Sequence, residues 1–293
     1  MSKVNKLQNK VVVVGDTKKK PTLKKTDRDA VRIVDAAVNG NGAVESKKIL
    51  IDPKSLKGIK SIESDWSEYK KCMVSPYKRS PRGCGIIKVE NLTEYQNKFR
   101  EYKRVWEKEV DAYCDNYDEI ISESRVRQGT NFDIGDLPVS RGDMRSRFEF
   151  EFVGPFALEN PEDLSFALND MEIDEIRKEV SDEIMESIKG SLSESYSRIN
   201  ELIEKLDKYD PDGPIGEKHG YHESALDNVR KAADALDNLN FTEHEGVSAI
   251  QKDMRDLLIG HTAESTKGNE SSRKDVVEKA KGIVKKNFAA FGY

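Results

Sequence analysis

Residues 92–120 read LTEYQNKFREYKRVWEKEVDAYCDNYDEI, and this stretch gives the clearest structural signal in the chain. Its apolar side chains recur every three or four residues, as they do along one face of an α-helix. These positions are Leu92, Tyr95, Phe99, Tyr102, Trp106, Val110, Tyr113, Tyr117 and Ile120. Charged residues lie between them, so the segment predicts a long amphipathic helix. Because the seam is aromatic, whereas a parallel two-stranded coiled coil prefers aliphatic side chains, we expect an antiparallel partner within the chain.

A second long helix is predicted over residues 169–210 and is the expected partner. Asn169 and Glu172 have the spacing of a capping box at its start. Its apolar stripe comprises Ile173, Ile176, Val180, Ile184, Ile188, Leu192, Tyr196, Ile199, Ile203 and Leu206. The breaker Asp-Pro-Asp-Gly-Pro at 210–214 ends it. At about 1.5 Å per residue this helix is roughly 55 Å long, so the two segments predict a long antiparallel helical hairpin.

The segment between the two long helices has the alternation of a strand. Residues 147–152 read Arg-Phe-Glu-Phe-Glu-Phe, which places three phenylalanines on one face. Val-Gly-Pro at 153–155 is expected to end this strand. Short strands are also predicted at 11–14, ending at the pair Gly15-Asp16, and at 47–51. We expect both to pair with the phenylalanine strand in a small sheet.

Shorter helices are predicted on either side of the hairpin. Residues 29–38 and 53–69 give one helix each, and Pro53 suits the first helical position of the second. Three more helices are expected in the C-terminal part: Ser224 to Leu239, one opened by a capping box of Thr242 and Glu245, and Val276 to Phe288 after a polar loop at 262–272.

The predicted fold class is therefore mainly α with a small β element (α+β), built as a long antiparallel helical hairpin plus a C-terminal helical bundle. Its expected segments are a basic N-terminal arm with a connecting segment (1–45), a strand and helix base carrying the hairpin (46–210), and the C-terminal bundle (211–293).

Composition favours long exposed helices, since 35% of residues are charged and the mean hydropathy is -0.72. No apolar run approaches the roughly 20 residues of a membrane helix, so no membrane association is expected. The N-terminus lacks the apolar core of a secretory signal. The cysteines, Cys72, Cys84 and Cys114, are odd in number, which argues against a secreted disulfide framework. We expect a cytoplasmic protein, or one in the host cytoplasm if it is phage-encoded.

Charge is distributed unevenly along the chain. Residues 1–104 contain 25 Lys/Arg and 12 Asp/Glu, a net charge of +13, and the remainder carries -18. Two interpretations are open. Either a basic and an acidic surface have different partners, or the basic face pairs with the acidic face of the same or a neighbouring copy.

Segment 70–88 is the candidate nucleic-acid site. Its functional residues are Lys70, Lys71, Tyr77, Lys78, Arg79, Arg82 and Lys88. Cationic side chains contact phosphates, and a tyrosine ring stacks on an unpaired base. The lysines of residues 18–28 would add non-specific charge. The acidic remainder repels nucleic acid, and the signatures of RNA- and DNA-binding modules are absent from the sequence.

No catalytic, cofactor-binding or metal site is predicted. His219 and His222 lie three apart without a nearby cysteine, which falls short of a zinc site. Residues 15–18 follow a valine run but lack the phosphate-loop frame, and Gly83-Cys84-Gly85 lacks a third glycine at dinucleotide-binding spacing. Both are interpreted as turns. Neighbouring cations favour a Cys84 thiolate, yet no histidine lies near it in sequence, so we interpret it as incidental. We expect a protein that is not an enzyme.

Several short phrases occur in a distinctive order. They are Ile-Asp-Pro-Lys-Ser-Leu at 51–56, the basic glycine-containing turn at 79–87, the aromatic helix from Leu92, Met-Arg-Ser-Arg-Phe-Glu-Phe at 144–150, the helix from Ile173, and the helix over 224–240. This order, over residues 30–290, resembles an uncharacterised family of phage and bacterial proteins known only as a domain of unknown function.

The resemblance implies a non-enzymatic protein. Some members of that family are encoded beside a MoxR-type AAA+ ATPase and a protein with a von Willebrand factor A-type domain, and these are the partners it implies. Our hypothesis is a phage-encoded interaction or adaptor protein that engages a complex such as an AAA+ ATPase machine. The alternative is an accessory single-stranded nucleic-acid-binding protein that uses the basic N-terminal third.

Overall fold

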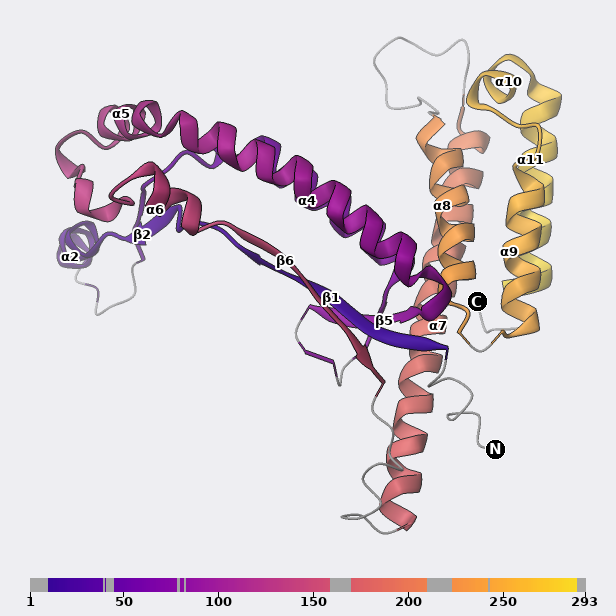
Figure 1. The fold of residues 1–293 in the computed structure, drawn as a ribbon. Helices are drawn as coiled ribbons and strands as arrows, with labels where there is room; N and C mark the ends of the chain where they lie inside the picture. Colours follow the sequence, from indigo (N-terminus) through magenta and orange to yellow (C-terminus); the bar gives the residue numbers. More distant parts are fainter. Residues whose placement is uncertain are drawn as a thin grey trace. The chain divides into compact units, whose positions relative to one another are not determined.

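Helices dominate the computed structural model, together with a small sheet (Figure 1). The structure describes residues 10–38, 40, 45–77, 80–81, 83–158, 170–209, 223–241 and 243–288. Its helices are α2 (Arg28–Ala37), α3 (Lys57–Met73), α4 (Leu92–Asp115), α5 (Tyr117–Gln128), α6 (Arg141–Ser146), α7 (Asp170–Asp207), α8 (Glu223–Leu239), α9 (Glu245–Leu257), α10 (Ala263–Gly268) and α11 (Glu270–Ile283). Its strands are β1 (Val11–Lys19), β2 (Lys24–Thr26), β3 (Lys47–Ile49), β4 (Ser75–Pro76), β5 (Cys84–Lys88) and β6 (Glu149–Ala157). The predicted class, mainly α with a small β element, is confirmed.

Contacts divide the chain into two compact units. Unit 1 comprises Met1–Gly15, Tyr69–Tyr95 and Gly154–Tyr293, and unit 2 comprises Asp16–Glu68 and Gln96–Val153. Strands β1 and β6 and helices α3 and α4 contribute residues to both units. This division differs from the three consecutive segments predicted, because segments distant in sequence fold together. In the described part of the chain, no helix is both long and apolar enough to cross a membrane.

Strand β1 lies inside a four-stranded sheet with the order β4-β5-β1-β6. It is antiparallel to β5 from Val11 to Gly15. The turn predicted at Gly15 is wrong, since the strand continues to Lys19. A Cβ at position 15 would lie 2.7 Å from the Gly83 carbonyl oxygen. Glycine is therefore required by the close approach of β5, and the segment is no phosphate-binding loop.

Strand β6 shows the predicted alternation, because Phe148 and Phe150 are buried and Phe152 is half-buried. The strand end predicted at 153–155 is wrong, since pairing continues to Ala157. β1 is its neighbour, as expected. β3 is not, because it pairs with β2 in a separate two-stranded sheet.

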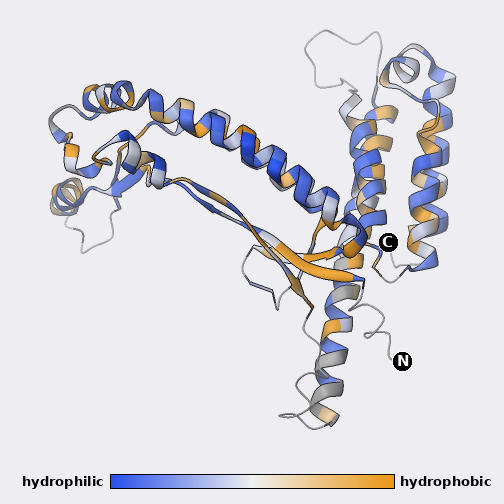
Figure 2. Ribbon diagram, in the orientation of Figure 1, coloured by the Kyte–Doolittle hydropathy of each residue, from blue (hydrophilic) through white to orange (hydrophobic). Residues whose placement is uncertain are grey.

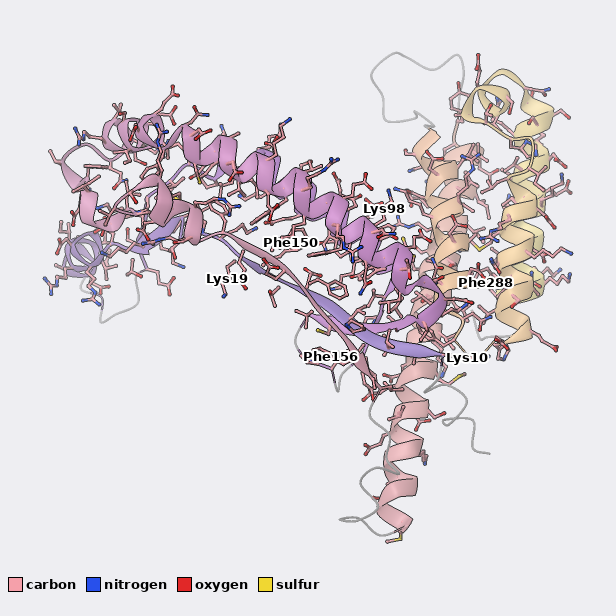
Figure 3. All side chains as sticks on the ribbon, in the orientation of Figure 1. Lys10, Lys19, Lys98, Phe150, Phe156 and Phe288 are labelled. Carbon is pink, nitrogen blue, oxygen red and sulfur yellow. The ribbon has the colours of Figure 1, made fainter. Side chains whose placement is uncertain are left out.

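The aromatic seam of α4 packs in unit 2 against α3 and β6. The Phe99 ring centroid lies 5.2 Å from that of Trp66 on α3 and 4.8 Å from that of Phe150 on β6. Trp106 contacts Phe150 at 5.6 Å, and Figure 3 shows Phe150 between the strand and the helix. The buried periodicity is confirmed, but the predicted helical partner is wrong. The phenylalanine rings of β6 make edge-to-face contacts with the aromatic side chains of α4. The aliphatic stripe of a helix such as α7 could not make such contacts.

A carboxylate lies within this aromatic core. Glu63 is buried, and its Oε1 accepts a hydrogen bond from the Trp106 indole N–H at 3.2 Å. Its Oε2 accepts from the Lys20 ammonium. The Lys18 ammonium lies 5.4 Å from the centre of the Phe150 ring, and Lys19 pairs with Glu149 at 2.5 Å. The lysines at 18–20, interpreted from sequence as part of a basic arm, thus stabilise unit 2.

Unit 1 holds the helical bundle, in which α7 packs on α8 and α11, and α8 on α9 (Figure 1). The apolar residues spaced three or four apart on α8 and α9 are all buried: Leu226, Val229, Ala233, Leu236, Val247, Ile250, Met254 and Leu257. Val11, Val13 and Ile86 of the sheet join the same core, and Figure 2 shows the start of β1 as strongly hydrophobic. The hairpin formed by α7 is therefore made with α8.

Two boundaries in the bundle differ from prediction. The cap of α9 is His244, whose Nδ1 accepts from the Gly246 N–H at 3.1 Å, so Glu245 is the first helical residue. Thr242, the other residue of the predicted capping box, lies outside the described residues. The predicted polar loop contains α10, because Thr262 and Ser265 form a reciprocal capping box that starts a short helix.

The first prediction concerns the aromatic core. Phe150→Ala should lower the free energy of unfolding by about 3–5 kcal/mol, because a buried ring with three aromatic neighbours leaves a cavity. Phe156→Ala, on the same strand but 49% exposed, is the matched control and should change it by less than about 0.5 kcal/mol. Urea denaturation followed by tryptophan fluorescence compares the two; equal effects would contradict this assignment of the core.

Candidate interaction surface

The sequence of α2 in unit 2 favours a helix in three ways: its N-cap, its lack of helix breakers and its apolar periodicity. The Asp27 carboxylate caps it by accepting from the Ala30 N–H at 3.0 Å. No Gly or Pro interrupts its ten residues. Apolar side chains recur along one face, at Ala30, Val31, Ile33, Val34, Ala37 and Val38. The predicted helix at 29–38 is thus confirmed as a strongly amphipathic one.

The apolar face of α2 is exposed. Its side chains include Ile33 at 69%, Val34 at 40% and Val38 at 60% exposure, and no residue of the helix is buried. An amphipathic surface helix ordinarily buries such a stripe. Ile49 on β3 and Ile134 are also exposed aliphatic residues of this unit. Clustered exposed apolar side chains mark interaction surfaces more often than single ones do.

Strands β2 and β3, which flank α2 in sequence, are held in place by hydrogen bonds and ion pairs. The Asp27 N–H donates to the Ser46 carbonyl at 2.9 Å, which joins the start of α2 to the residue before β3. The Asp136 carboxylate, 5% exposed, accepts from Lys25 on β2 at 2.5 Å and from Lys48 on β3 at 2.8 Å. These two lysines are opposite each other in the β2–β3 register. Asp136 therefore fastens both strands from one face.

The Asp136 carboxylate also has the clearest pKa shift among the residues that support α2. Hydrogen bonds from Lys25 and then Lys48 hold the pKa of Asp136 below the ordinary value of 3.8. Leu50, which follows β3, is anchored in turn by the Ser124 hydroxyl of α5, which donates to its carbonyl. Unit 2 thus presents α2 on an ordered support.

The segment that contains α2, β2 and β3 carries charges of both signs. Among the described side chains of residues 24–49, the exposed cations are Lys24, Lys25, Arg28, Arg32 and Lys47. The exposed carboxylates of the same range are Asp29 and Glu45. Lys25 pairs with Asp136, Arg32 with Asp29 and Lys47 with Glu45, so neighbouring carboxylates offset much of this positive charge.

The predicted nucleic-acid residues are placed differently from one another. Lys78, Arg79 and Arg82 lie outside the described residues. Tyr77 is 6% exposed and belongs to the core of unit 1, so its ring would have to leave that core to stack on a base. Lys71 is exposed on α3.

Two further lysines of the predicted site make contacts in unit 1. Lys70 donates to the Gly83 carbonyl at 2.5 Å, and Lys88 donates to the Asp237 carbonyl at 2.8 Å. Lys88, Lys10, Glu243 and Asn240 also line a cavity of about 240 Å³, where Lys10 pairs with Glu243 at 2.6 Å. The ammonium groups of Lys70 and Lys88 thus contact carbonyl oxygens of the protein itself. The nucleic-acid site stays a prediction.

The other chemically reactive residues are dispersed. His219 and His222 lie outside the described residues. His261 Nδ1 is 3.3 Å from the Ser272 hydroxyl, and its Nε2 is 3.7 Å from an Asp275 carboxylate that also pairs with Lys279. These contacts tie the segment before α10 to α11. In the range that the structure describes, no three His, Cys, Asp or Glu side chains are grouped to hold a metal ion.

Gly83-Cys84-Gly85 is a turn only in part. Gly83 has a φ of 85°, which suits a turn, whereas Cys84 and Gly85 belong to β5. A Cβ on Gly85 would lie 2.1 Å from the Ser75 carbonyl oxygen. The sequence suggested a turn at both glycines, but Gly85 is required because β5 pairs closely with β4 at this position.

Comparison with protein-family models, with curated proteins and with solved structures returns no match. The surface around α2 was missed by sequence reasoning. The periodicity of residues 28–38 predicts an amphipathic helix, but the same pattern is typical of a helix that buries its stripe. Exposure of that stripe is a tertiary property.

The second prediction tests the support of α2. Asp136→Asn removes the charge that pairs with Lys25 and Lys48, so amide hydrogen exchange in β2 and β3 should become faster by tenfold or more, while α8 and α9 are unaffected. Asp133→Asn, in the same turn, is the matched control.

Acid should act on the same contacts. A carboxylate whose pKa is lowered in the folded state stabilises the fold above its unfolded pKa, and this contribution is lost as pH falls through the folded value. The protection factors of β2 and β3, which compare exchange with the intrinsic rate at each pH, should thus fall below pH 3.8 in the wild type, and less so in Asp136→Asn. An identical acid response in both proteins would contradict the role given to Asp136.

Proposed function

We propose that this chain is a non-enzymatic, phage-encoded interaction protein that engages a protein complex through the exposed apolar face of α2. The observation that carries the proposal is that face: three aliphatic side chains are 40% exposed or more on a helix with no buried residue. Burial of apolar surface contributes about 25 cal/mol per Å². A partner that covers these side chains would gain this contribution.

The ordered support of α2 favours binding without a large entropic cost. The helix is already capped by Asp27, and β2 and β3 beneath it are fastened by Asp136. A preorganised surface loses less conformational freedom on association than a segment that folds upon binding. The partner class named by the family resemblance, an AAA+ ATPase or a von Willebrand factor A-type protein, is part of this proposal.

The third prediction tests this function with a charge placed on each face of α2. Ile33→Glu combined with Val34→Glu should weaken binding to a partner by at least about tenfold, which corresponds to about 1.4 kcal/mol. Ala36→Glu adds the same side chain on the opposite, polar face of the same helix and should leave binding unchanged. Glutamate is a good helix former, so both proteins should keep the helix.

Binding is measured by biolayer interferometry with the purified AAA+ ATPase and von Willebrand factor A-type protein encoded in the same genome. Cross-linking in the native cell, with the wild type and both variants, extends the test to other partners. A partner retained equally by all three proteins would refute a role of the α2 face. Recovery of no partner by any of them would refute the interaction function.

A further inference from the structure

We infer that a cavity in unit 1, lined by Lys10, Lys88 and Glu243, binds a small monocarboxylate with an apolar body, and that this ligand displaces Glu243 from Lys10. The site is separate from the α2 face, so the inference goes beyond the proposed function. The cavity has a volume of about 240 Å³, which leaves room for a compact organic anion. Val89 and Phe241 add apolar residues to its lining. A few charged groups beside apolar surface are typical of a small-molecule site.

Hydrogen bonds between segments distant in sequence hold the walls of this cavity. The Val89 N–H donates to the Lys10 carbonyl at 2.8 Å, which joins the residue before β1 to the residue after β5. The Lys88 ammonium donates at 2.8 Å to the carbonyl of Asp237, near the end of α8. Asn240, 6% exposed, uses its side-chain amide to bond the residues that open α9. The cavity is therefore formed by ordered parts of unit 1.

The Glu243 carboxylate marks the position of an anion in this site. Its Oε1 lies 2.6 Å from the Lys10 ammonium nitrogen. The hydrogen bond from Lys10 and the charge of Lys10, with a smaller contribution from the charge of Lys88, lower the pKa of Glu243. Both ammonium groups therefore stabilise negative charge at this position. A ligand carboxylate in the same place would have the same two partners.

Two features make Glu243 replaceable by a ligand. Among the described residues other than glycine, Glu243 alone has a left-handed backbone, with a φ of 53°. Backbone strain of this kind is concentrated at ligand-binding and switch positions. The side chain of Glu243 is 74% exposed and that of Lys10 is 48% exposed. An ion pair this open to solvent contributes little to stability, so the Glu243 side chain can turn into solvent at small cost.

Charge and apolar surface together define the class of ligand. Once Glu243 has turned away, the two lysines share the lining with one carboxylate, Glu90, whose Oε1 lies 3.5 Å from the Lys88 ammonium nitrogen. Two positive charges and one negative charge suit a monoanion. Val89, which is 44% exposed, and Phe241 form the apolar part of the lining. The site therefore fits a molecule that joins one carboxylate to a small apolar body.

The fourth prediction uses benzoate as the probe, because it joins one carboxylate to an apolar ring. Glu243→Gln removes the competing carboxylate and should bind benzoate at least about tenfold more tightly than the wild type does. Glu264→Gln removes an exposed carboxylate on α10 of the same unit. It is the matched control and should change the affinity by less than about twofold at physiological salt. Lys88→Met, added to Glu243→Gln, should weaken binding by at least about tenfold, since it removes a cationic partner of the carboxylate.

Backbone amide chemical shifts, followed by two-dimensional NMR during titration of the full chain, measure the affinity and locate the site. Benzamide is the neutral control for the probe, and inorganic phosphate is a second anion. Circular dichroism shows that each variant keeps its helix content. Lys10→Met, at an exposed side chain, should also weaken binding by Glu243→Gln, and it replaces Lys88→Met if that variant does not fold.

Shift changes near Lys10, Val89 and Phe241 that require the carboxylate of the probe support the inference. It is overturned if benzoate causes no shift change at these residues, or if Glu243→Gln and Glu264→Gln bind benzoate equally. It is also overturned if benzamide binds as tightly as benzoate, or if phosphate binds more tightly, because the ligand would then not be a monocarboxylate. These outcomes leave the proposed function untouched, since they do not involve α2.

Discussion

The close approach of β5 to its two neighbours is the constraint on which the sheet depends. Glycine occupies position 85 because a Cβ there would meet the Ser75 carbonyl oxygen at 2.1 Å, and position 15 because a Cβ would meet that of Gly83 at 2.7 Å. These contacts set the register of β4 and β1 against β5. Since β4 directly follows α3 and β5 shortly precedes α4, the same register fixes where both helices are attached to the sheet.

The aromatic core of unit 2 and its ion pairs together support helix α2. The Phe99 ring meets those of Trp66 and Phe150 edge to face, the Trp106 ring is tilted against that of Phe150, and each ring buries a large apolar area. Glu63 is tolerated in this core because an indole N–H and an ammonium group satisfy its carboxylate. Asp136 then fastens β2 and β3, which hold α2. The exposed stripe of α2 is supported by a chain of satisfied contacts and is therefore an ordered surface.

Charge has three distinct roles in this molecule. Lys18 and Lys20 stabilise the aromatic core, and Lys25 and Lys48 pair with one carboxylate. Only the remaining exposed cations are available to steer a partner. The net charge of +13 on residues 1–104 therefore overstates the positive charge at the surface, because several of these lysines are paired with carboxylates of the protein. Steering by exposed charge affects association rates most strongly at low salt.

Periodicity alone predicted the longer helices α4, α7, α8 and α9, and the faces that α4, α8 and α9 bury. The seam of α4, the inward residues of α8 and α9, and the helix at α2 follow from spacing, since a helical period of 3.6 residues places every third or fourth side chain on one face. Spacing does not name the partner of a face, and α4 packs on β6 and α3 where a long helix was expected. It also cannot distinguish a glycine in a turn from a glycine between two strands, as at Gly15. Whether an apolar stripe is covered, as on α8, or exposed, as on α2, depends on which distant segments pack against it, and only the tertiary structure decided that.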